Sequence, residues 1–121
     1  DKVDDHGFIE QSALVKLVRQ AGALIIPSLN EGFNLPLLEG MAAGAPVLCS
    51  DIPASKELGK NYVHYFSPTV VESMAQAMIA LASQPVVEAD LLLAQKYAQD
   101  FTWQKSFSQL LSVYTAILNP R

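Results

Sequence analysis

The sequence predicts an α/β fold in which helices cover a parallel sheet on both sides. Two short, continuous apolar runs have the character of buried parallel strands, a third strand is expected in a short segment that contains one histidine, and each is followed by a segment with helical spacing of apolar residues. Strands that alternate with helices are joined by right-handed crossovers into a parallel sheet. A complete doubly wound domain has about five or six strands. We therefore expect one partial domain over residues 1–121, equivalent to the second half of such a sheet, with the first half outside this sequence.

The individual elements follow from apolar spacing and from residues that begin or end helices. Strands are expected at 23–26, 47–49 and 63–66, and helices at 12–21, 36–43, 54–59, 70–83, 87–99 and 102–118, after a leading segment 1–10. Ser12 and Thr102 are expected to cap their helices, Pro36 suits a first helical turn, and Gly44 is expected to end that helix.

Large apolar side chains are expected to fill the core between these elements. Met41, Met74 and Met78 are assigned to it, and Trp103 is expected to anchor the last helix. That helix places further apolar residues on one face, namely Phe107, Leu110, Leu111, Tyr114 and Leu118.

Composition excludes several classes of function. The formal charge is −4 and the basic residues are scattered, which argues against binding to nucleic acid or to an anionic membrane. The single cysteine, Cys49, cannot form an internal disulfide and is expected to be a buried strand thiol. No apolar run approaches the roughly 20 residues of a membrane helix, and the acidic start does not resemble a signal peptide. These features favour a soluble protein or domain of a reducing, cytoplasmic compartment.

The segment 28–39 is the most informative for function, because it follows the first predicted strand and runs into the next helix. In open parallel sheets, ligands bind outside the carboxyl ends of the strands. A helix that begins there offers free N–H groups and a partial positive charge, which suit a phosphate. We expect the backbone amides of Asn34, Leu35 and Leu37 to converge on a diphosphate, whereas Pro36 has no amide hydrogen.

Two carboxylates, Glu31 and Glu39, flank this predicted anion site. Gly32 allows the backbone to approach a ligand closely, and Asn34 adopts a left-handed conformation more readily than most residues. A nucleotide sugar has the matching layout, with phosphates in the middle and hydroxyl groups at both ends. Taken alone, the two glutamates are better explained as ordinary solvated carboxylates, since an acid early in a helix, such as Glu39, is favoured by the helix dipole.

Other polar residues have simpler interpretations. His64 is expected to pack or to lie at the sheet edge, and His6 belongs to the leading segment. Ser50 and Asp51 either border the site or form a turn, and Glu57 either approaches the sugar or caps locally.

Residues 31–53, EGFNLPLLEGMAAGAPVLCSDIP, resemble the signature of the retaining glycosyltransferases of family 4, which have the GT-B fold. The shared features are Glu-Gly-Phe-x-Leu-Pro, a second Glu after seven residues, Met-Ala-x-Gly-x-Pro-Val and a turn like Ser-Asp-Ile-Pro. The resemblance extends over residues 12–118. It implies that the chain is part of the C-terminal, donor-binding lobe of a Rossmann-like GT-B enzyme.

The resemblance also implies roles for individual residues. Glu31 would contact a hydroxyl of the donor sugar near the reacting centre, so it is the catalytic candidate, as a positioning and electrostatic group rather than a nucleophile. The backbone of Gly32, Phe33, Asn34 and Leu35 would line the sugar and diphosphate, and Glu39 would bind ribose. The activity implied is that of a retaining, hexosyltransferase-type enzyme with a nucleoside-diphosphate sugar as donor and no cofactor or metal. An acceptor glycan, lipid or small molecule would bind a separate N-terminal domain, with peripheral contact at the inner face of the membrane as an option.

The chain departs from the family pattern in ways that bear on function. Asn34 stands where the family usually has Gly, and Ser67 where an Asp before Pro68 is common. The family also binds diphosphate with an Arg and a Lys located well upstream of the first glutamate, and this chain has no such pair. We therefore expect the chain alone to bind a donor weakly at best. Two alternatives stay open, namely a non-catalytic nucleotide-binding or interaction module and another GT-B-like enzyme such as a sugar-nucleotide epimerase.

Overall fold

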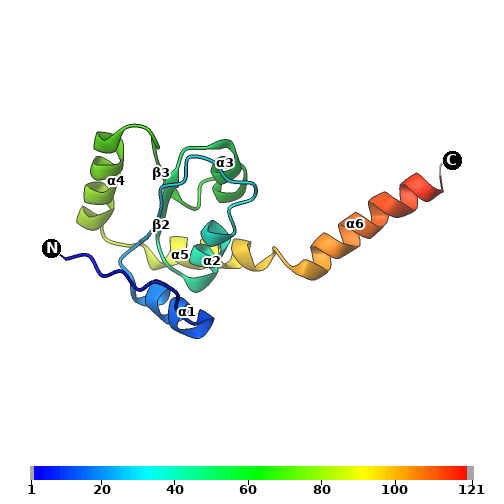
Figure 1. Ribbon diagram of the computed structural model, residues 1–121, viewed down its shortest axis with the longest axis horizontal. Coiled ribbons are helices and arrows are strands. Elements are labelled where there is room, and N and C mark those ends of the chain that lie inside the picture. Colours follow the sequence, from blue (N-terminus) through cyan, green and yellow to red (C-terminus); the bar gives the residue numbers. More distant parts are fainter. Residues whose placement is uncertain (1, 120–121) are drawn as a thin grey trace.

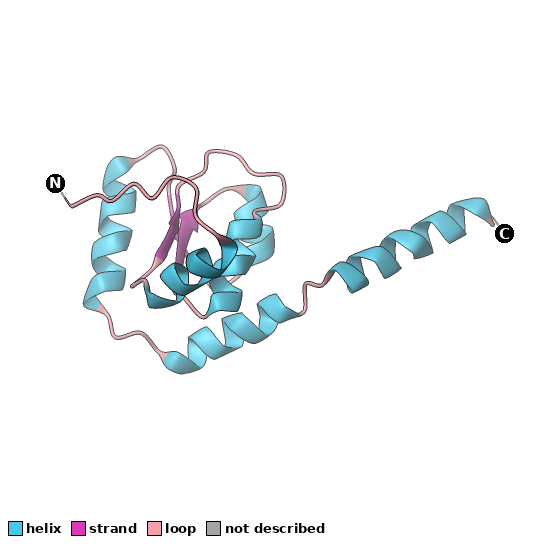
Figure 2. Ribbon diagram, turned by 60° about the horizontal axis from the view of Figure 1, so that its bottom comes forward, coloured by secondary structure: helices cyan, strands magenta, loops and turns pink. Residues whose placement is uncertain are grey.

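The computed structural model describes residues 2–119 and has a parallel sheet of three strands at its centre (Figures 1 and 2). The strands are β1 (Leu24–Ile26), β2 (Val47–Ser50) and β3 (His64–Phe66), and their order in the sheet is β1-β2-β3. Cys49 at the middle of the sheet pairs with Ile26 of β1 and with Tyr65 of β3. The predicted α/β class, with a parallel Rossmann-like sheet, is confirmed.

Within the part of the chain that the structure describes, six helices surround or extend from this sheet, and each one matches a predicted helix to within two residues at either end. They are α1 (Gln11–Gln20), α2 (Leu35–Ala43), α3 (Pro53–Gly59), α4 (Val71–Ser83), α5 (Glu88–Gln99) and α6 (Trp103–Leu118). Helix α2 packs on β1 and β2 and is covered by α5. Helix α4 packs against β3 and lines a cavity with Ile25 and Leu48, so it covers the opposite face of the sheet.

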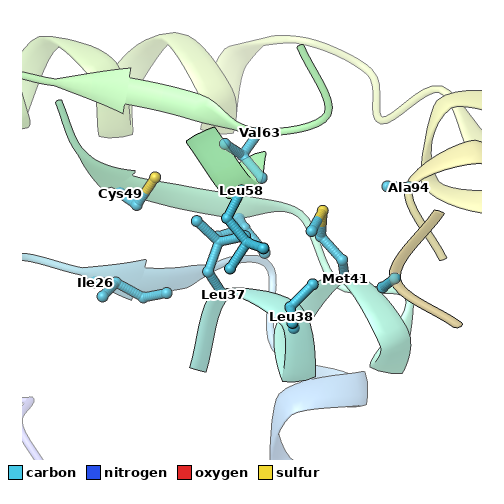
Figure 3. Close-up of a cluster of buried hydrophobic side chains, with 10 residues drawn as sticks. Ile26, Leu37, Leu38, Met41, Cys49, Leu58, Val63 and Ala94 are labelled. Atoms are coloured by element: carbon cyan, nitrogen blue, oxygen red, sulfur yellow. The ribbon is translucent and has the colours of Figure 1, made fainter. Parts of the chain in front are cut away.

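The core lies between α2 and the sheet (Figure 3). Leu37 and Met41 of α2, like Val47 and Cys49 of β2, are almost completely buried, as predicted for Met41 and Cys49. The rest of this cluster is Ile26, Leu38, Leu58, Val63, Ala94 and Ala98. Because the apolar residues of α2 contact both the sheet and α5, the position of this helix is strongly determined.

Gly40 allows α2 to lie close to the sheet. A Cβ atom at this position would lie 2.7 Å from Leu24 Cδ2 and 2.8 Å from Val47 Cγ2. Both distances are shorter than a normal van der Waals contact, so any side chain here would have to push the helix or its neighbours away. Gly44, with φ 78°, adopts the left-handed conformation that ends α2, as predicted.

The ends of the other helices confirm one predicted cap and correct another. The Thr102 hydroxyl oxygen accepts a hydrogen bond from the Lys105 N–H at 3.2 Å, which confirms the predicted cap of α6. Ser12 is not a cap, because α1 already begins at Gln11 and its N-cap residue, Glu10, makes no side-chain capping bond.

The prediction that Trp103 anchors the last helix is wrong. Trp103 is 85 % exposed, and α6 has no buried residue. The helix extends away from the sheet and the helices that cover it (Figure 1). The spacing of apolar residues gives the helix an apolar face, and the Thr102 cap supports its first turn. The other described elements do not cover that face. Met78 is also 42 % exposed rather than part of the core, and no residue of α4 is fully buried.

Within residues 2–119, no single helix is long and apolar enough to cross a bilayer, although α4 and α5, joined at an angle of 118°, pass together by length and composition alone.

Candidate functional site

The candidate site lies at the carboxyl edge of the sheet, where the chain leaves β1 at Ile26 and enters α2 at Leu35. Helix α2 has a proline in its first turn, so this turn has one amide hydrogen fewer to satisfy. The N-terminus of the helix carries a partial positive charge, and its axis is held by the buried contacts of Leu37 and Met41. The sequence thus places a rigid, positively polarised helix end beside an exposed loop.

The backbone of this loop offers free hydrogen-bond donors. Among the described residues, no hydrogen bond is donated by the N–H groups of Gly32, Phe33, Asn34 or Leu35. The Leu37 N–H donates to the Asn34 carbonyl oxygen at 3.1 Å, so it does not contribute to the predicted cluster of free amides. The free N–H groups therefore run from Gly32 to Leu35 and do not include the predicted one of Leu37. Phe33 and Leu35 are about half-exposed, which leaves this stretch accessible.

Glu31 is partly buried and is held by a neighbour in the same loop. The Ser28 hydroxyl donates to Glu31 Oε1 at 2.7 Å. A hydrogen bond to a carboxylate is stronger than one between neutral groups, so it restricts the orientation of the Glu31 side chain. Ser28 was not predicted to have a role, although its position three residues before Glu31 in a turn-forming segment was a usable signal.

Glu39 lies one turn inside α2 and is exposed. It lines a cavity of about 410 Å³ between α1 and α2, together with Leu14, Val18 and Arg19. Glu31 does not line this cavity, and the two glutamates share no hydrogen-bond partner among the described residues. The structure therefore places the predicted acids in two different environments, one in the loop and one on the α1 side of α2.

A second cavity, of about 390 Å³, joins the loop to the junction of α5 and α6. Phe33 and Leu35 line it from the loop, and Trp103 and Lys105 line it from α6. Lys105 Nζ forms an ion pair with Asp100 Oδ1 at 2.8 Å, and its hydrogen bond lowers the pKa of that carboxyl. The sequence has no Lys or Arg between Glu31 and Ala54, and only the fold brings this distant cation to the loop.

Asn34 connects the loop to α3. It has φ 69° and ψ 56°, which confirms the predicted left-handed conformation, and it is 2 % exposed. Its Nδ2 donates to the hydroxyl oxygen of Ser55 at 3.0 Å. Ser55, which is completely buried in the first turn of α3, was not among the predicted site residues.

The other polar residues considered for the site are Asp51, His64 and Glu57, and local structure accounts for the first two. Asp51 forms an exposed ion pair with Lys56 at 2.8 Å, which supports the local interpretation of this turn. His64 is exposed on β3, at one edge of the described sheet, as expected. Glu57 is exposed on α3, and a role for it near a sugar stays a prediction.

The fold defines the architectural class of the chain. It matches the C-terminal Rossmann-like fold of GT-B glycosyltransferases, as in sucrose-phosphate synthase from Thermosynechococcus elongatus. The TM-score is 0.80 at 22 % sequence identity, and the match covers 93 % of this chain and 29 % of that one.

The chain belongs to the Glycosyl transferases group 1 family, whose sequence profile matches residues 1–114. It is 29 % identical over 110 residues to O-antigen chain mannosyltransferase B of Escherichia coli, covering 89 % of this chain and 29 % of that protein. It is 31 % identical over 125 residues to D-inositol 3-phosphate glycosyltransferase of Streptomyces griseus subsp. griseus, covering 98 % of this chain and 26 % of that protein. The chain thus spans between a quarter and a third of the length of these relatives.

Proposed function

We propose that this chain is the nucleotide-sugar-binding part of a larger retaining glycosyltransferase, here termed the complete protein. The observation that carries the proposal is the run of free amides at 32–35 beside the N-terminus of α2, at the carboxyl edge of a parallel sheet. Such an arrangement suits a diphosphate, and membership in a glycosyltransferase family supports a sugar as the group attached to it.

In this proposal, the backbone of Gly32, Phe33, Asn34 and Leu35 contacts the sugar and the diphosphate. Glu31, oriented by Ser28, accepts a hydrogen bond from a sugar hydroxyl near the anomeric carbon and stabilises positive charge that develops there. Glu39 accepts hydrogen bonds from ribose. The bond between the anomeric carbon and the diphosphate oxygen breaks, the acceptor oxygen bonds to that carbon from the same face, and the proton of the acceptor hydroxyl passes to the departing diphosphate. No residue of this chain acts as a nucleophile, and the reaction requires no metal.

The acceptor, which is a glycan, a lipid or a small molecule, binds a domain outside this sequence. We place the complete protein in the cytoplasm, with the inner face of the membrane as an optional location for a lipid acceptor. A net charge of −4 supports the exclusion of nucleic acid as a partner.

Substitution of the two glutamates separates their roles. We expect Glu31→Ala to abolish sugar transfer while it largely spares nucleotide binding. We expect Glu39→Ala to weaken nucleotide binding by about 1–3 kcal/mol, the loss of hydrogen bonds to a charged group. Glu88→Ala is the matched control, because Glu88 is an exposed acid in the first turn of α5. Its neighbours Val87 and Asp90 share a cavity with Pro46 and His64, at the amino ends of the strands. Full activity and unchanged affinity in both site variants would show that the site lies elsewhere.

Calorimetric titration of the 121-residue chain with uridine, guanosine and adenosine diphosphates tests the proposal that this chain is only part of the active enzyme. We expect weak binding, with a dissociation constant above about 1 μM, because Lys105, the cation that lines the cavity beside this loop, is already paired with Asp100. Submicromolar affinity, or sugar transfer by this chain alone, would contradict the view that it is only part of the active enzyme.

A further inference from the structure

An asparagine at position 34 is unfavourable in two respects, one of the backbone and one of the side chain. Its φ of 69° lies in the left-handed region, which any residue other than glycine adopts at a cost. Its Oδ1 is buried and has no hydrogen-bond partner among the described residues. Burial of an unpaired acceptor also costs stability. A glycine would avoid both costs, so the carboxamide is not explained by the needs of the backbone or of the core.

The other half of this carboxamide makes a specific contact across the fold. Asn34 Nδ2 donates to Ser55 Oγ at 3.0 Å, and the two residues are 2 % and 0 % exposed. Asn34 ends the loop that follows β1, and Ser55 lies in the helix that follows β2. The bond therefore ties together two segments that leave neighbouring strands at the carboxyl edge of the sheet. A buried bond of this kind is shielded from competition with water.

The backbone of Asn34 sets the direction of the loop amides. Asn34 is the residue immediately before α2, and its carbonyl oxygen accepts the first hydrogen bond of that helix from the Leu37 N–H. Its φ and ψ thus decide how the chain from Gly32 to Asn34 is oriented relative to the helix. If Asn34 left the left-handed region, the directions of the Phe33 and Asn34 N–H groups relative to the Leu35 N–H would change.

We propose that Asn34 and Ser55 are positioning residues for the nucleotide sugar, in that their buried hydrogen bond holds the loop before α2 in the conformation that binds the diphosphate. The inference rests on the proposed function. Both side chains are buried, so they act through the backbone amides and do not contact the ligand themselves. Apparent affinity is reduced by the fraction of molecules whose loop is competent to bind. If loss of the bond lowers that fraction to about 0.1–0.3, the dissociation constant rises by about 3–10-fold.

A double-mutant cycle on the complete protein tests this proposal. The four proteins are the unaltered one, Ser55→Ala, Asn34→Gly and the double variant, and the probe is whichever of uridine, guanosine or adenosine diphosphate the unaltered protein binds most tightly. We expect Ser55→Ala to raise the dissociation constant by about 3–10-fold when Asn34 is present. We expect the same change to have less than about a twofold effect in the Asn34→Gly background, because no carboxamide is left to hold. KM for the nucleotide sugar should follow the dissociation constant, with kcat changed less.

Circular dichroism and thermal unfolding of each variant separate binding from folding. If Ser55 only supports the packing of α3, Ser55→Ala will lower the melting temperature and change affinity equally in both backgrounds, which would overturn the inference. An unchanged dissociation constant in Ser55→Ala would also overturn it. Failure of the unaltered complete protein to bind any of the three diphosphates would instead refute the proposed function, and with it the role assigned to this pair.

Discussion

Replacement of Gly32 with alanine tests whether the loop before α2 meets its ligand through the backbone. Gly32 is exposed, its φ is not in the left-handed region, and an added Cβ would have no described atom within 4 Å. The folded chain therefore accepts alanine without strain. Since alanine restricts the unfolded chain more than glycine does, the free energy of unfolding should rise by about 0.4–1 kcal/mol.

The same methyl group should obstruct a ligand that lies against this backbone. We expect the dissociation constant for a nucleotide sugar to rise about tenfold, which corresponds to about 1.4 kcal/mol. Stability would be measured by urea denaturation and affinity by calorimetric titration of the complete protein. The expected signature is a protein that is more stable but binds more weakly.

Gly22→Ala is the matched control for this experiment. Gly22 is also exposed, and a Cβ there would likewise have no described atom within 4 Å, but it precedes β1 at the amino end of the sheet. It should gain similar stability and keep its affinity. If Gly32→Ala binds the nucleotide sugar as tightly as Gly22→Ala does, the ligand does not contact the loop at this residue, and the reasoning from backbone access is refuted.

Three further predictions concern stability. Burial raises the pKa of the Cys49 thiol from 9.0 to about 11, with a hydrogen bond to Ser55 acting in the opposite direction. Between these pH values the unfolded chain loses the thiol proton and the folded chain keeps it, so the free energy of unfolding should fall with rising pH, by at most about 1.4 kcal/mol per unit. Urea denaturation should show a steeper loss than in Cys49→Ala, and equal slopes would contradict the assignment. Lys60 has φ 47° and its ammonium lies 4.9 Å from the centre of the Tyr97 ring. Lys60→Gly and Lys60→Ala both lose this contact, but only glycine relieves the backbone, so the glycine variant should be more stable by about 1 kcal/mol; the reverse order in thermal unfolding would argue against strain. Ending the chain after Thr102 should change the free energy of unfolding by less than about 1 kcal/mol, because α6 has no buried residue. A larger loss in urea would mean that α6 packs on the rest of the chain in solution.

The sequence was sufficient for the features that depend on local spacing. Apolar runs and helical periodicity predicted the three strands and six helices, and residue type predicted the left-handed conformation of Asn34 and the helix end at Gly44. Helix starts were harder to predict. The type of residue at Ser12 suggested a cap, but α1 begins at Gln11 without any side-chain cap.

Features that depend on tertiary contacts were not predictable in the same way. Helical spacing shows that α6 has an apolar face, but it does not show whether another element covers that face, and Trp103 was misassigned for this reason. The contact between Asn34 and Ser55 joins a loop and a helix that only the sheet topology brings together. The fact that Lys105 and Phe33 line one cavity likewise follows from the packing of α5 on α2. The roles of Glu31 and Glu39 stay predictions.

The narrow gap at Gly40 makes the site sensitive to a buried residue that has no proposed contact with the donor. Gly40 is five positions along α2 from Leu35, or roughly 7–8 Å along the helix axis. Because Leu24 and Val47 lie directly against Gly40, a bulkier residue at this position would change the angle between α2 and the sheet. The amide end of α2 would then swing relative to Glu31, whose loop is attached to β1. The distance between α2 and the sheet at Gly40 thus sets the spacing of the groups proposed to hold the donor. Substitution of Gly40 would be a means to alter donor preference without any change in the residues proposed to contact the donor.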